Sequence, residues 1–462
     1  MAKEKRRPPV KKNDEIIVTC EDLTHEGNGV VKVDNYPLFI QYLLPGEKAK
    51  VRVVKANKNF GYGKLLSIES RSDARVEPPC NVFYRCGGCQ IQHMDYNAQL
   101  EMKRNNVVNN LKRIGHLDDV TVHAVLGMED PWYYRNKIQM PVGEKNGSLI
   151  TGFYRERSHQ IIPDMDTCLI QNKYGDEIID VVREIANDLH IDAYDEKNHR
   201  GVLRHIIVRT AYETNETMII LVTKTKKLPH EAEMIKQLTE KRAEIKSIIH
   251  NVNPARTNVI LGNETRTIYG EDYIYDRIGS LKFKLSAKSF FQVNPTQTKV
   301  LYEQALAYAQ VGENDIVIDA YCGIGSISLF LAKRAKKVYG VEIVPEAIED
   351  AKENAKLNNI NNIEFTVGKA EEVMPKWKKD GLQPNVIVVD PPRKGCDEKL
   401  LQAMIDMEPE RIVYVSCNPA TLARDLRILE DGGYKTQEVQ PVDMFSQTYH
   451  VECVSLLQRE TI

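Results

Sequence analysis

The sequence predicts an α/β protein in which a small β-barrel and a mixed α+β part precede a doubly wound parallel-sheet domain. From Asp315 onward, short apolar strands alternate with helical patterns, as in a parallel sheet that helices cover on both faces. Between Glu15 and Glu69, polar and apolar residues instead alternate in short segments that turn residues separate. The length of 462 residues also exceeds what one hydrophobic core supports, so several folded parts are expected.

These patterns divide the chain into four parts. Residues 1–12 carry several Lys and Arg residues, and we expect a solvated basic tail. Residues 13–75 form the predicted barrel, and residues 76–270 form a central domain of mixed helices and strands. Residues 271–462 form the Rossmann-like domain, because their strands and helices alternate as in open α/β folds.

Composition excludes several classes of protein. Hydrophobic residues make up 42% of the chain and charged residues 28%, which is ordinary for a globular protein. The longest uncharged apolar stretch, Ala320–Ala332, is shorter than the ~20 residues of a membrane-spanning helix. The N-terminus lacks the apolar core of a secretory signal, so we expect a cytoplasmic protein without a membrane partner. With a net charge of -2, an anionic partner has to be bound by local basic patches.

The barrel contains one hairpin suited to binding nucleic acid. Lys55, Lys58 and Lys64 flank Phe60–Gly63, so charges that attract phosphates lie beside aromatic rings that stack on bases. From these residues alone, an ordinary exposed hairpin is as good an interpretation. The order of the turn motifs, however, resembles the TRAM domain, a small RNA-binding barrel, which favours RNA as a partner. The motifs are Gly27-Asn-Gly, Leu44-Pro-Gly-Glu, Gly61-Tyr-Gly-Lys, Ser70-Arg-Ser and Pro78-Pro-Cys.

The Rossmann-like domain begins with a candidate cofactor site. Residues Asp319–Ser326 follow its first strand and form a glycine-rich turn that opens a helix, where a ligand approaches the backbone closely. The spacing lacks the complete dinucleotide-binding fingerprint. Glu342 ends the next strand, where an acid binds the ribose hydroxyls of a nucleoside. Together these features favour S-adenosylmethionine over a nicotinamide cofactor.

Two further segments belong at this site. Asp390 follows the fourth strand, so its carboxylate lies at the carboxyl edge of the sheet, where open α/β proteins bind ligands. Before the sheet, Asn294 and Pro295 have the character of a helix N-cap and a first-turn residue. Gln292 is therefore expected at a fixed junction between loop and helix.

Cys417 is the candidate nucleophile. It follows the fifth strand and directly precedes a predicted helix, whose positive end favours a thiolate. Taken alone, a cysteine here is more often a small buried residue, but this one shares the sheet edge with Asp390 and the cofactor turn. Glu452 lies in an apolar strand near the C-terminus. Burial there raises the pKa of a carboxyl group and suits Glu452 to proton abstraction.

The motifs in combination resemble the RNA uracil-5 methyltransferases, over about residues 15–459. They are Phe291-Gln-Val-Asn-Pro, Asp319-Ala-Tyr-Cys-Gly, Asp390-Pro-Pro-Arg, Ser416-Cys-Asn-Pro and His450-Val-Glu. Carbon 5 of uracil is a poor nucleophile, so a thiolate first adds to carbon 6. The resemblance implies that Cys417 is this nucleophile, that Glu452 accepts the carbon-5 proton, and that the S-adenosylmethionine-binding residues are Gln292, Tyr321, Glu342 and Asp390. Tyr321 stands where family members often carry Phe.

Four of the nine cysteines form a candidate metal site. Cys80, Cys86 and Cys89 lie close together with two glycines between the last pair, and Cys168 is the candidate fourth ligand. From the spacing alone, zinc and an iron–sulfur centre are equally open. The resemblance to rRNA-type members implies a 4Fe-4S cluster. Cys20, Cys322, Cys396 and Cys453 have no partner at a suitable spacing, and we interpret them as structural thiols.

The sequence therefore predicts an S-adenosylmethionine-dependent RNA uracil-5 methyltransferase. The barrel together with the four cysteines favours 23S rRNA as its target over the tRNA T-loop, and no obligate protein partner is evident. An amino-methyltransferase of the Asp-Pro-Pro-Tyr type is disfavoured, since Arg393 replaces the aromatic residue and Cys417 has no role there. A non-catalytic RNA-binding iron–sulfur protein is a remote alternative.

Overall fold

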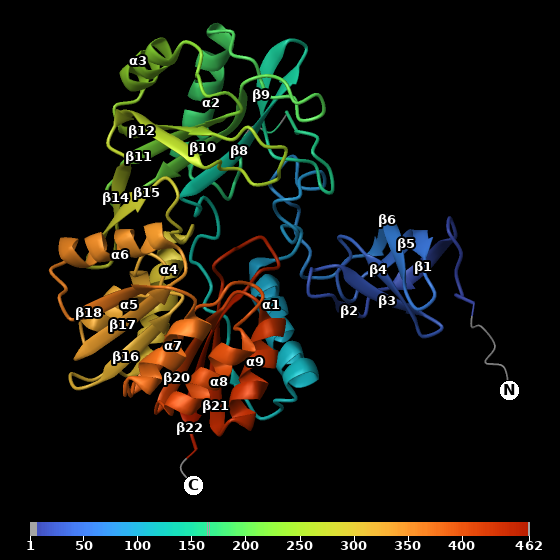
Figure 1. The fold of residues 1–462 in the computed structure, drawn as a ribbon. Helices are drawn as coiled ribbons and strands as arrows, with labels where there is room; N and C mark the ends of the chain where they lie inside the picture. Colours follow the sequence, from blue (N-terminus) through green and yellow to red (C-terminus); the bar gives the residue numbers. More distant parts are fainter. Residues whose placement is uncertain (1–6, 164, 166, 461–462) are drawn as a thin grey trace.

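Figure 1 shows a computed structural model that describes residues 7–163, 165 and 167–460. The N-terminal barrel lies to one side, and helix α1 (Tyr96–Asn110) stands between the barrel and the C-terminal sheet. The central sheet lies above that domain in the same view. None of the helices in the described residues is long and apolar enough to cross a membrane.

The N-terminal part is a six-stranded barrel, as predicted. Its strand order is β1-β5-β6-β4-β3-β2, with β4 and β6 parallel and the other neighbouring pairs antiparallel. Alternate residues point inward, so Ala49, Val51 and Val53 are fully buried between exposed neighbours. The strands are β1 (Glu15–Thr19), β2 (Asp22–Leu23), β3 (Gly29–Val33), β4 (Tyr36–Ile40), β5 (Lys48–Ala56) and β6 (Gly61–Ser70).

The predicted basic tail is only partly a tail. Residues 1–6 lie outside the described part of the chain. Val10, at 4% exposure, packs into the barrel core, and the backbone N–H of Asn13 donates to the carbonyl of Val53 at 2.8 Å. Val10 and Asn13 thus join this segment to the barrel, whereas Lys11 and Lys12 are exposed, and a single apolar residue among charges gives no periodic signal in the sequence.

The central sheet has six strands in the order β13-β12-β11-β10-β8-β9. Helices α2 (Lys173–Asp188) and α3 (Glu231–Lys241) cover one face. The other face packs on the hairpin β14–β15 and on the C-terminal domain in one continuous core. The strands are β8 (Lys137–Lys145), β9 (Ser148–Thr151), β10 (Leu203–Thr210), β11 (Thr217–Thr223), β12 (Ile245–Val252), β13 (Glu264–Gly270), β14 (Tyr273–Ile278) and β15 (Leu281–Ser286).

The C-terminal domain is the doubly wound sheet that the sequence predicts. Its order is β18-β17-β16-β19-β20-β22-β21-β7, and the first five strands in this order are mutually parallel. The strands are β16 (Ile316–Ala320), β17 (Lys337–Glu342), β18 (Ile363–Val367), β19 (Val386–Val389), β20 (Arg411–Ser416), β21 (Tyr434–Val442) and β22 (Glu452–Arg459).

Helices cover both faces of this sheet. One group of helices shares a core with the central domain, and it comprises α4 (Pro295–Ala309), α5 (Ser326–Ala332) and α6 (Pro345–Leu357). The opposite face is covered by α7 (Ala370–Lys379), α8 (Glu398–Met407) and α9 (Pro419–Asp431). The prediction of a parallel sheet enclosed between two helical layers is confirmed.

Helix α1 and the segment after it pack with the C-terminal sheet. Val107 of α1 and Leu111, in the short π-helix η1 (Leu111–Gly115), share a core with Leu426 of α9. Strand β7 (Thr121–Val122) then adds to the sheet edge, parallel to β21. The sequence-based division places this segment in the central domain, because a single helical pattern does not reveal which core the helix joins.

Candidate active site

The candidate residues meet at the carboxyl edge of the C-terminal sheet. The strand order reverses between β16 and β19, which are neighbours, so Asp319 and Asp390 lie at the point where such folds bind ligands. Cys417 follows β20. Ser416 pairs with Cys453 in the antiparallel β20–β22 register, so Cys417, one residue beyond β20, lies beside Glu452, the first residue of β22. Sheet register alone thus brings the predicted nucleophile beside the predicted base.

Cys417 lies just before helix α9, as predicted. The side chain of Asn418 caps the helix by accepting from the backbone N–H of Ala420 at 3.1 Å. Burial nevertheless raises the pKa of the Cys417 thiol to about 11, and the carboxylates of Glu452 and Asp390 raise it further, whereas Arg393 lowers it. Desolvation and two nearby acids thus favour the protonated thiol in the free protein, and they oppose the effect expected from the helix end.

Glu452 is 4% exposed, at the start of β22. Burial raises the pKa of its carboxyl group to about 8, and the charge of Asp390 adds to this effect, while Arg393 opposes it. The direction agrees with the sequence-based expectation. At neutral pH the free site therefore holds a proton on Glu452 most of the time.

A small pocket lies at the glycine-rich turn after β16. Gln292, Tyr321 and Asp390 line it, and so does Asp319. The Oδ1 atom of Asp319 is buried without a hydrogen-bond partner, and the position of a Cβ on Gly323 would meet no atom within 4 Å. An unpaired carboxylate oxygen beside an open backbone turn fits a cationic nucleoside such as S-adenosylmethionine, which supplies a methyl group on a positive sulfur.

Glu342 and Gln292 are fixed by the backbone around this pocket. The Glu342 carboxylate accepts from the N–H of Gly323 at 3.3 Å and from the N–H of Val344 at 3.0 Å. Asn294 caps α4 as predicted, since its side chain accepts from the N–H of Gln297 at 3.2 Å. Glu342 therefore faces the glycine turn, and Gln292 lies two residues before the Asn294 cap of α4.

Sequence reasoning missed two features of the site. Asp319 belongs to a recognised motif, but only the structure shows it as a buried carboxyl whose pKa burial raises to about 7. His450 lines the same cavity as Cys417, and burial lowers its pKa to about 4, as do the charges of Arg393, Lys103 and Arg135. A strand-end acid is visible in a sequence, whereas the neighbours that set its pKa are not.

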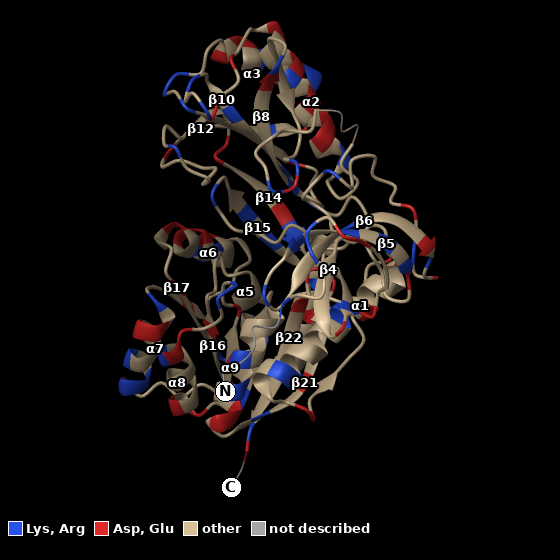
Figure 2. Ribbon diagram, turned by 90° about the vertical axis from the view of Figure 1, so that its right-hand side faces the viewer, with Lys and Arg blue, Asp and Glu red and all other residues tan. Residues whose placement is uncertain are grey.

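A cleft of about 1080 Å³ leads from the barrel to Cys417. Strands of the barrel form one wall and α1 forms the other, with the loop before α9 at the end of the cleft. Its lining mixes charges of both signs, and Figure 2 shows Lys and Arg interspersed with Asp and Glu over the ribbon. Residues that line it include His25, Phe39, Asn105, Asn109, Arg113 and His450.

The predicted stacking residues form an aromatic cluster on the barrel. Phe60 is 37% exposed and Tyr62 is 40% exposed, and their ring centroids lie 5.7 Å apart. Phe39 lies 5.9 Å from each of these rings and also lines the cleft. One aromatic surface therefore reaches from the predicted hairpin into the cleft that ends at Cys417.

The four cysteines of the candidate metal site are free thiols and lie near one another. Their mutual electrostatic interactions show which thiols are neighbours. Cys80 raises the pKa of Cys86, Cys80 and Cys86 both raise that of Cys89, and Cys89 raises that of Cys168. Burial raises the pKa of the Cys89 thiol to about 12. Within the described residues, however, no group of three or more potential ligands is arranged as a metal site. The donor set suits a thiolate-bound metal, but the described side chains do not converge on one.

Comparison with known proteins agrees with this geometry. Residues 179–460 match the family described as tRNA (uracil-5-)-methyltransferase, and residues 9–66 match the TRAM domain. An RNA methyltransferase of Oceanobacillus iheyensis, described as uncharacterized, is 62% identical over 453 residues, 98% of each chain. A similarly described RNA methyltransferase of Bacillus cereus is 56% identical over 455 residues, 98% of this chain and 99% of the relative.

A solved structure similar to this chain supports S-adenosylmethionine as the methyl donor. The crystal structure of Pyrococcus abyssi tRNA (uracil-54, C5)-methyltransferase in complex with S-adenosyl-L-homocysteine is 29% identical, with a TM-score of 0.77. The match covers 96% of this chain and 100% of that one. Because a family model matches more than half of the chain and relatives match nearly all of it, the protein belongs to the tRNA (uracil-5-)-methyltransferase family and is an S-adenosylmethionine-dependent RNA methyltransferase of the uracil-5 type.

Proposed function

We propose that this enzyme converts uridine in 23S rRNA to 5-methyluridine through a covalent adduct between Cys417 and uracil. The observation that carries the proposal is the position of Cys417, at the end of the cleft between barrel and α1 and beside Glu452 in the sheet register. A half-buried thiol that lines an open cleft, with a buried carboxyl group beside it, suits addition to a base and removal of a proton from it.

The pKa values of the groups around Cys417 suit each group to one step of the reaction. Cys417 retains its proton in the free protein, so a base accepts it when uracil enters. Asp390 is suited to this role, since burial raises its pKa only to about 6 and it is mostly ionised at neutral pH. The sulfur of Cys417 then bonds to carbon 6, and carbon 5 gains the nucleophilic character that methyl transfer requires.

Glu452 acts after methyl transfer. Its carboxylate takes the proton from carbon 5, the electron pair of that C–H bond re-forms the ring double bond, and the bond between Cys417 and carbon 6 breaks. Glu452 has to be ionised for this step. Because its pKa is about 8, we expect activity to rise with pH toward that value.

We propose 23S rRNA as the target on the combination of the barrel with four neighbouring cysteines. Transfer RNA is the second candidate, and a specific observation favours it, since the similar Pyrococcus abyssi protein is a tRNA (uracil-54, C5)-methyltransferase. Mapping 5-methyluridine in total RNA from cells with and without this gene tests the choice. Loss of the modification from 23S rRNA alone supports the proposal, and loss from tRNA alone contradicts it.

We further propose that Cys80, Cys86, Cys89 and Cys168 hold a 4Fe-4S cluster. Four neighbouring thiols are a donor set that iron–sulfur clusters and zinc both accept. Methyl transfer moves no electron through the protein, so these cysteines would have a structural role. The aromatic cluster of Phe39, Phe60 and Tyr62 would stack on bases of the RNA beside the target.

A further inference from the structure

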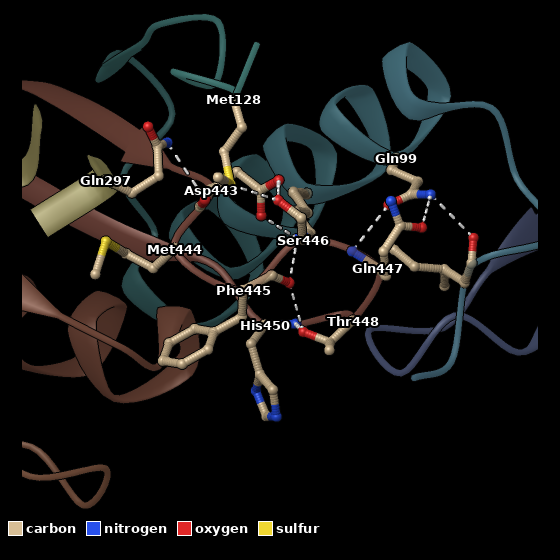
Figure 3. Close-up of polar contacts among 12 residues, drawn as sticks. Gln99, Met128, Gln297, Asp443, Met444, Phe445, Ser446, Gln447, Thr448 and His450 are labelled. Carbon is tan, nitrogen blue, oxygen red and sulfur yellow. Dashed lines mark hydrogen bonds and ion pairs between the residues drawn. The ribbon is translucent and has the colours of Figure 1, made fainter. Parts of the chain in front are cut away.

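The loop 443–451 joins β21 to β22 and leads directly into Glu452. Although it is a loop, most of its side chains are buried, with Asp443 and Ser446 at 0% exposure and Gln447 at 2%. Figure 3 shows its polar groups in contact with residues from several other parts of the chain. The last residues of the loop include His450, which lines the cleft beside Cys417.

A fully buried ion pair anchors the start of this loop. Lys103 of α1 and Asp443 are both 0% exposed, and the Nζ of Lys103 lies 2.5 Å from Oδ1 of Asp443. The other carboxylate oxygen of Asp443 accepts from Ser446 and from Tyr96, each at 2.7 Å. A charge buried this completely is costly unless every partner is in place, so the pair permits few alternative arrangements of the loop.

Five successive carbonyls of the loop, from Asp443 to Gln447, each accept a hydrogen bond from outside it. The donors come from four separate segments, so no single neighbour determines the path of the loop. In order along the loop, they are Gln297 at 3.3 Å, Asn294 at 3.0 Å, Lys103 at 3.1 Å, Tyr134 at 2.9 Å, and the N–H groups of Gln90 and Ile91 at 3.1 and 3.3 Å.

Lys103 has a special place among these donors, because it makes two contacts with the loop at once. It neutralises Asp443 and also donates to the carbonyl of Phe445, the third of the five carbonyls. One turn earlier on α1, Gln99 donates to Oε1 of Gln447 at 3.0 Å, and its own Oε1 accepts from the Gln447 N–H at 3.3 Å. The buried stripe of α1 thus holds both ends of the segment 443–447.

We propose that Lys103 is a positioning residue for the methyl-transfer reaction, and that it acts through Asp443 and the Phe445 carbonyl to place the loop that presents His450 and Glu452 beside Cys417. The inference rests on the proposed covalent function and adds a residue to it. Lys103 touches neither substrate nor cofactor in this account. Displacements of about 1 Å in an active site cost up to about 100-fold in rate, so small movements of this loop matter.

The test compares adduct formation with stability in the full-length protein. RNA that carries 5-fluorouridine at the target measures addition of Cys417, and isothermal titration measures affinity for S-adenosylmethionine. For Lys103→Met we expect adduct formation to slow about 10- to 100-fold at saturating RNA, while cofactor affinity stays within about twofold of wild type. The melting temperature should also fall, since the charge of Asp443 is left buried without a positive partner.

A double variant separates positioning from stability. Lys103→Met with Asp443→Asn removes both charges, so stability should recover while the contact with the Phe445 carbonyl remains lost. We expect slow adduct formation in this variant too. If the recovered stability is accompanied by a wild-type rate, Lys103 is merely structural and the inference is overturned. The double variant also provides the answer if Lys103→Met does not fold.

Arg75→Met is the matched control. It breaks a comparably buried pair, Arg75–Glu47, with side chains 5% and 0% exposed and 2.5 Å between Nε and Oε1. We expect it to lose stability without a change in adduct formation at saturating RNA. Wild-type protein that methylates RNA but forms no adduct would contradict the covalent mechanism. Normal adduct formation in folded Lys103→Met would contradict only the positioning role of Lys103.

Discussion

At the residue scale, the site consists of acids that hold their protons more tightly than usual. Burial raises the pKa of Asp390 to about 6, of Asp319 to about 7, of Glu452 to about 8 and of the Cys417 thiol to about 11. The site therefore carries less negative charge than its residues suggest, which lowers the cost of admitting a phosphate backbone. A bound sulfonium would have the opposite effect and lower these pKa values.

Replacing Cys417 tests the nucleophile. We expect Cys417→Ala to reduce turnover by about a thousandfold or more, because carbon 6 loses its attacking group. Affinity for S-adenosylmethionine should stay nearly unchanged, since that pocket is lined by other segments. Turnover assays with calorimetry measure both quantities. Cys453→Ala, at a buried cysteine of β22, is the control for loss of a thiol, and retained turnover in Cys417→Ala would contradict the role.

Glu452→Gln tests the proton acceptor. The amide cannot take the carbon-5 proton, so the variant should add Cys417 to uracil, transfer the methyl group and then stall. Incubation with labelled S-adenosylmethionine and RNA should yield a denaturant-resistant protein–RNA species that carries the label. Turnover at the wild-type rate in a folded variant would remove Glu452 from the mechanism.

The same substitution should change stability in a pH-dependent way. The folded-state pKa of Glu452 is about 8 against an ordinary value of 4.5, so its contribution to stability is complete below pH 4.5 and is lost as pH rises toward 8. Glu452→Gln should therefore match wild type near pH 4.5 and exceed it by up to about 5 kcal/mol above pH 8. Chemical denaturation across this range measures the difference, with exposed Glu408→Gln as the control.

The sequence was informative about these residues wherever a role depends on local pattern. The helix caps at Asn294 and Asn418 follow from residue type and from the proline that follows each. The protonation state of Cys417 does not, because it depends on acids that fold beside it from other strands. Lys103 also escaped notice, since its partner Asp443 lies 340 residues further along the chain.

At the element scale, the segment that follows Cys89 is hydrogen-bonded directly to the loop 443–451. Gln90 and Ile91, which follow Cys89, donate their N–H groups to the carbonyl of Gln447. The sequence placed these cysteines and the catalytic motifs in different domains, and nothing in either pattern reveals the contact. A backbone displacement at Cys89 would therefore reach the loop that precedes Glu452 through these two hydrogen bonds.

Metal analysis tests the cluster at this scale. If four thiolates hold a 4Fe-4S cluster, anaerobically purified protein should be brown and contain about four irons per chain. Cys168→Ser should lower the iron content, whereas Cys20→Ser, at a buried thiol in the barrel core, should leave it unchanged. One zinc per chain without iron would contradict the cluster.

The aromatic hairpin gives a second test of an element. Phe60→Ala and Tyr62→Ala should each weaken RNA binding by about 1–3 kcal/mol if their rings stack on bases. Affinity for S-adenosylmethionine should not change, because the cluster lies on the barrel. Ile17→Ala, at an apolar residue of β1 that is 56% exposed, is the matched control. Equal RNA affinity in all three variants would leave the hairpin without a role in binding.

At the scale of the whole molecule, the barrel and the C-terminal domain enclose the cleft together. With a net charge of -2 and mixed charges along the cleft, attraction to RNA depends on local groups. The hairpin lysines are three such groups, all exposed. The sequence predicts the barrel, which forms one wall of the cleft. The other wall is α1, whose position depends on its packing with α9, and local patterns do not reveal that contact.

Salt dependence measures the contribution of these lysines. Replacing Lys55, Lys58 and Lys64 together with Gln should reduce the slope of log Kd against log salt concentration by about 2, since each phosphate contact with a single strand contributes about 0.7. The control replaces Lys376, Lys378 and Lys379 of α7, a helix that Figure 1 places away from the barrel. Equal slopes in the two variants would show that the hairpin makes no phosphate contacts.

The pairing of Lys103 with Asp443 also has a consequence for biosynthesis. At about 5–20 residues per second, a ribosome adds Asp443 roughly 20–70 s after Lys103, because 340 residues separate them. Throughout that interval the buried face of α1 has none of its partners from the loop 443–451. A chain cut short before Asp443 lacks both the loop 443–451 and Glu452, so the group of residues around Cys417 is incomplete in it.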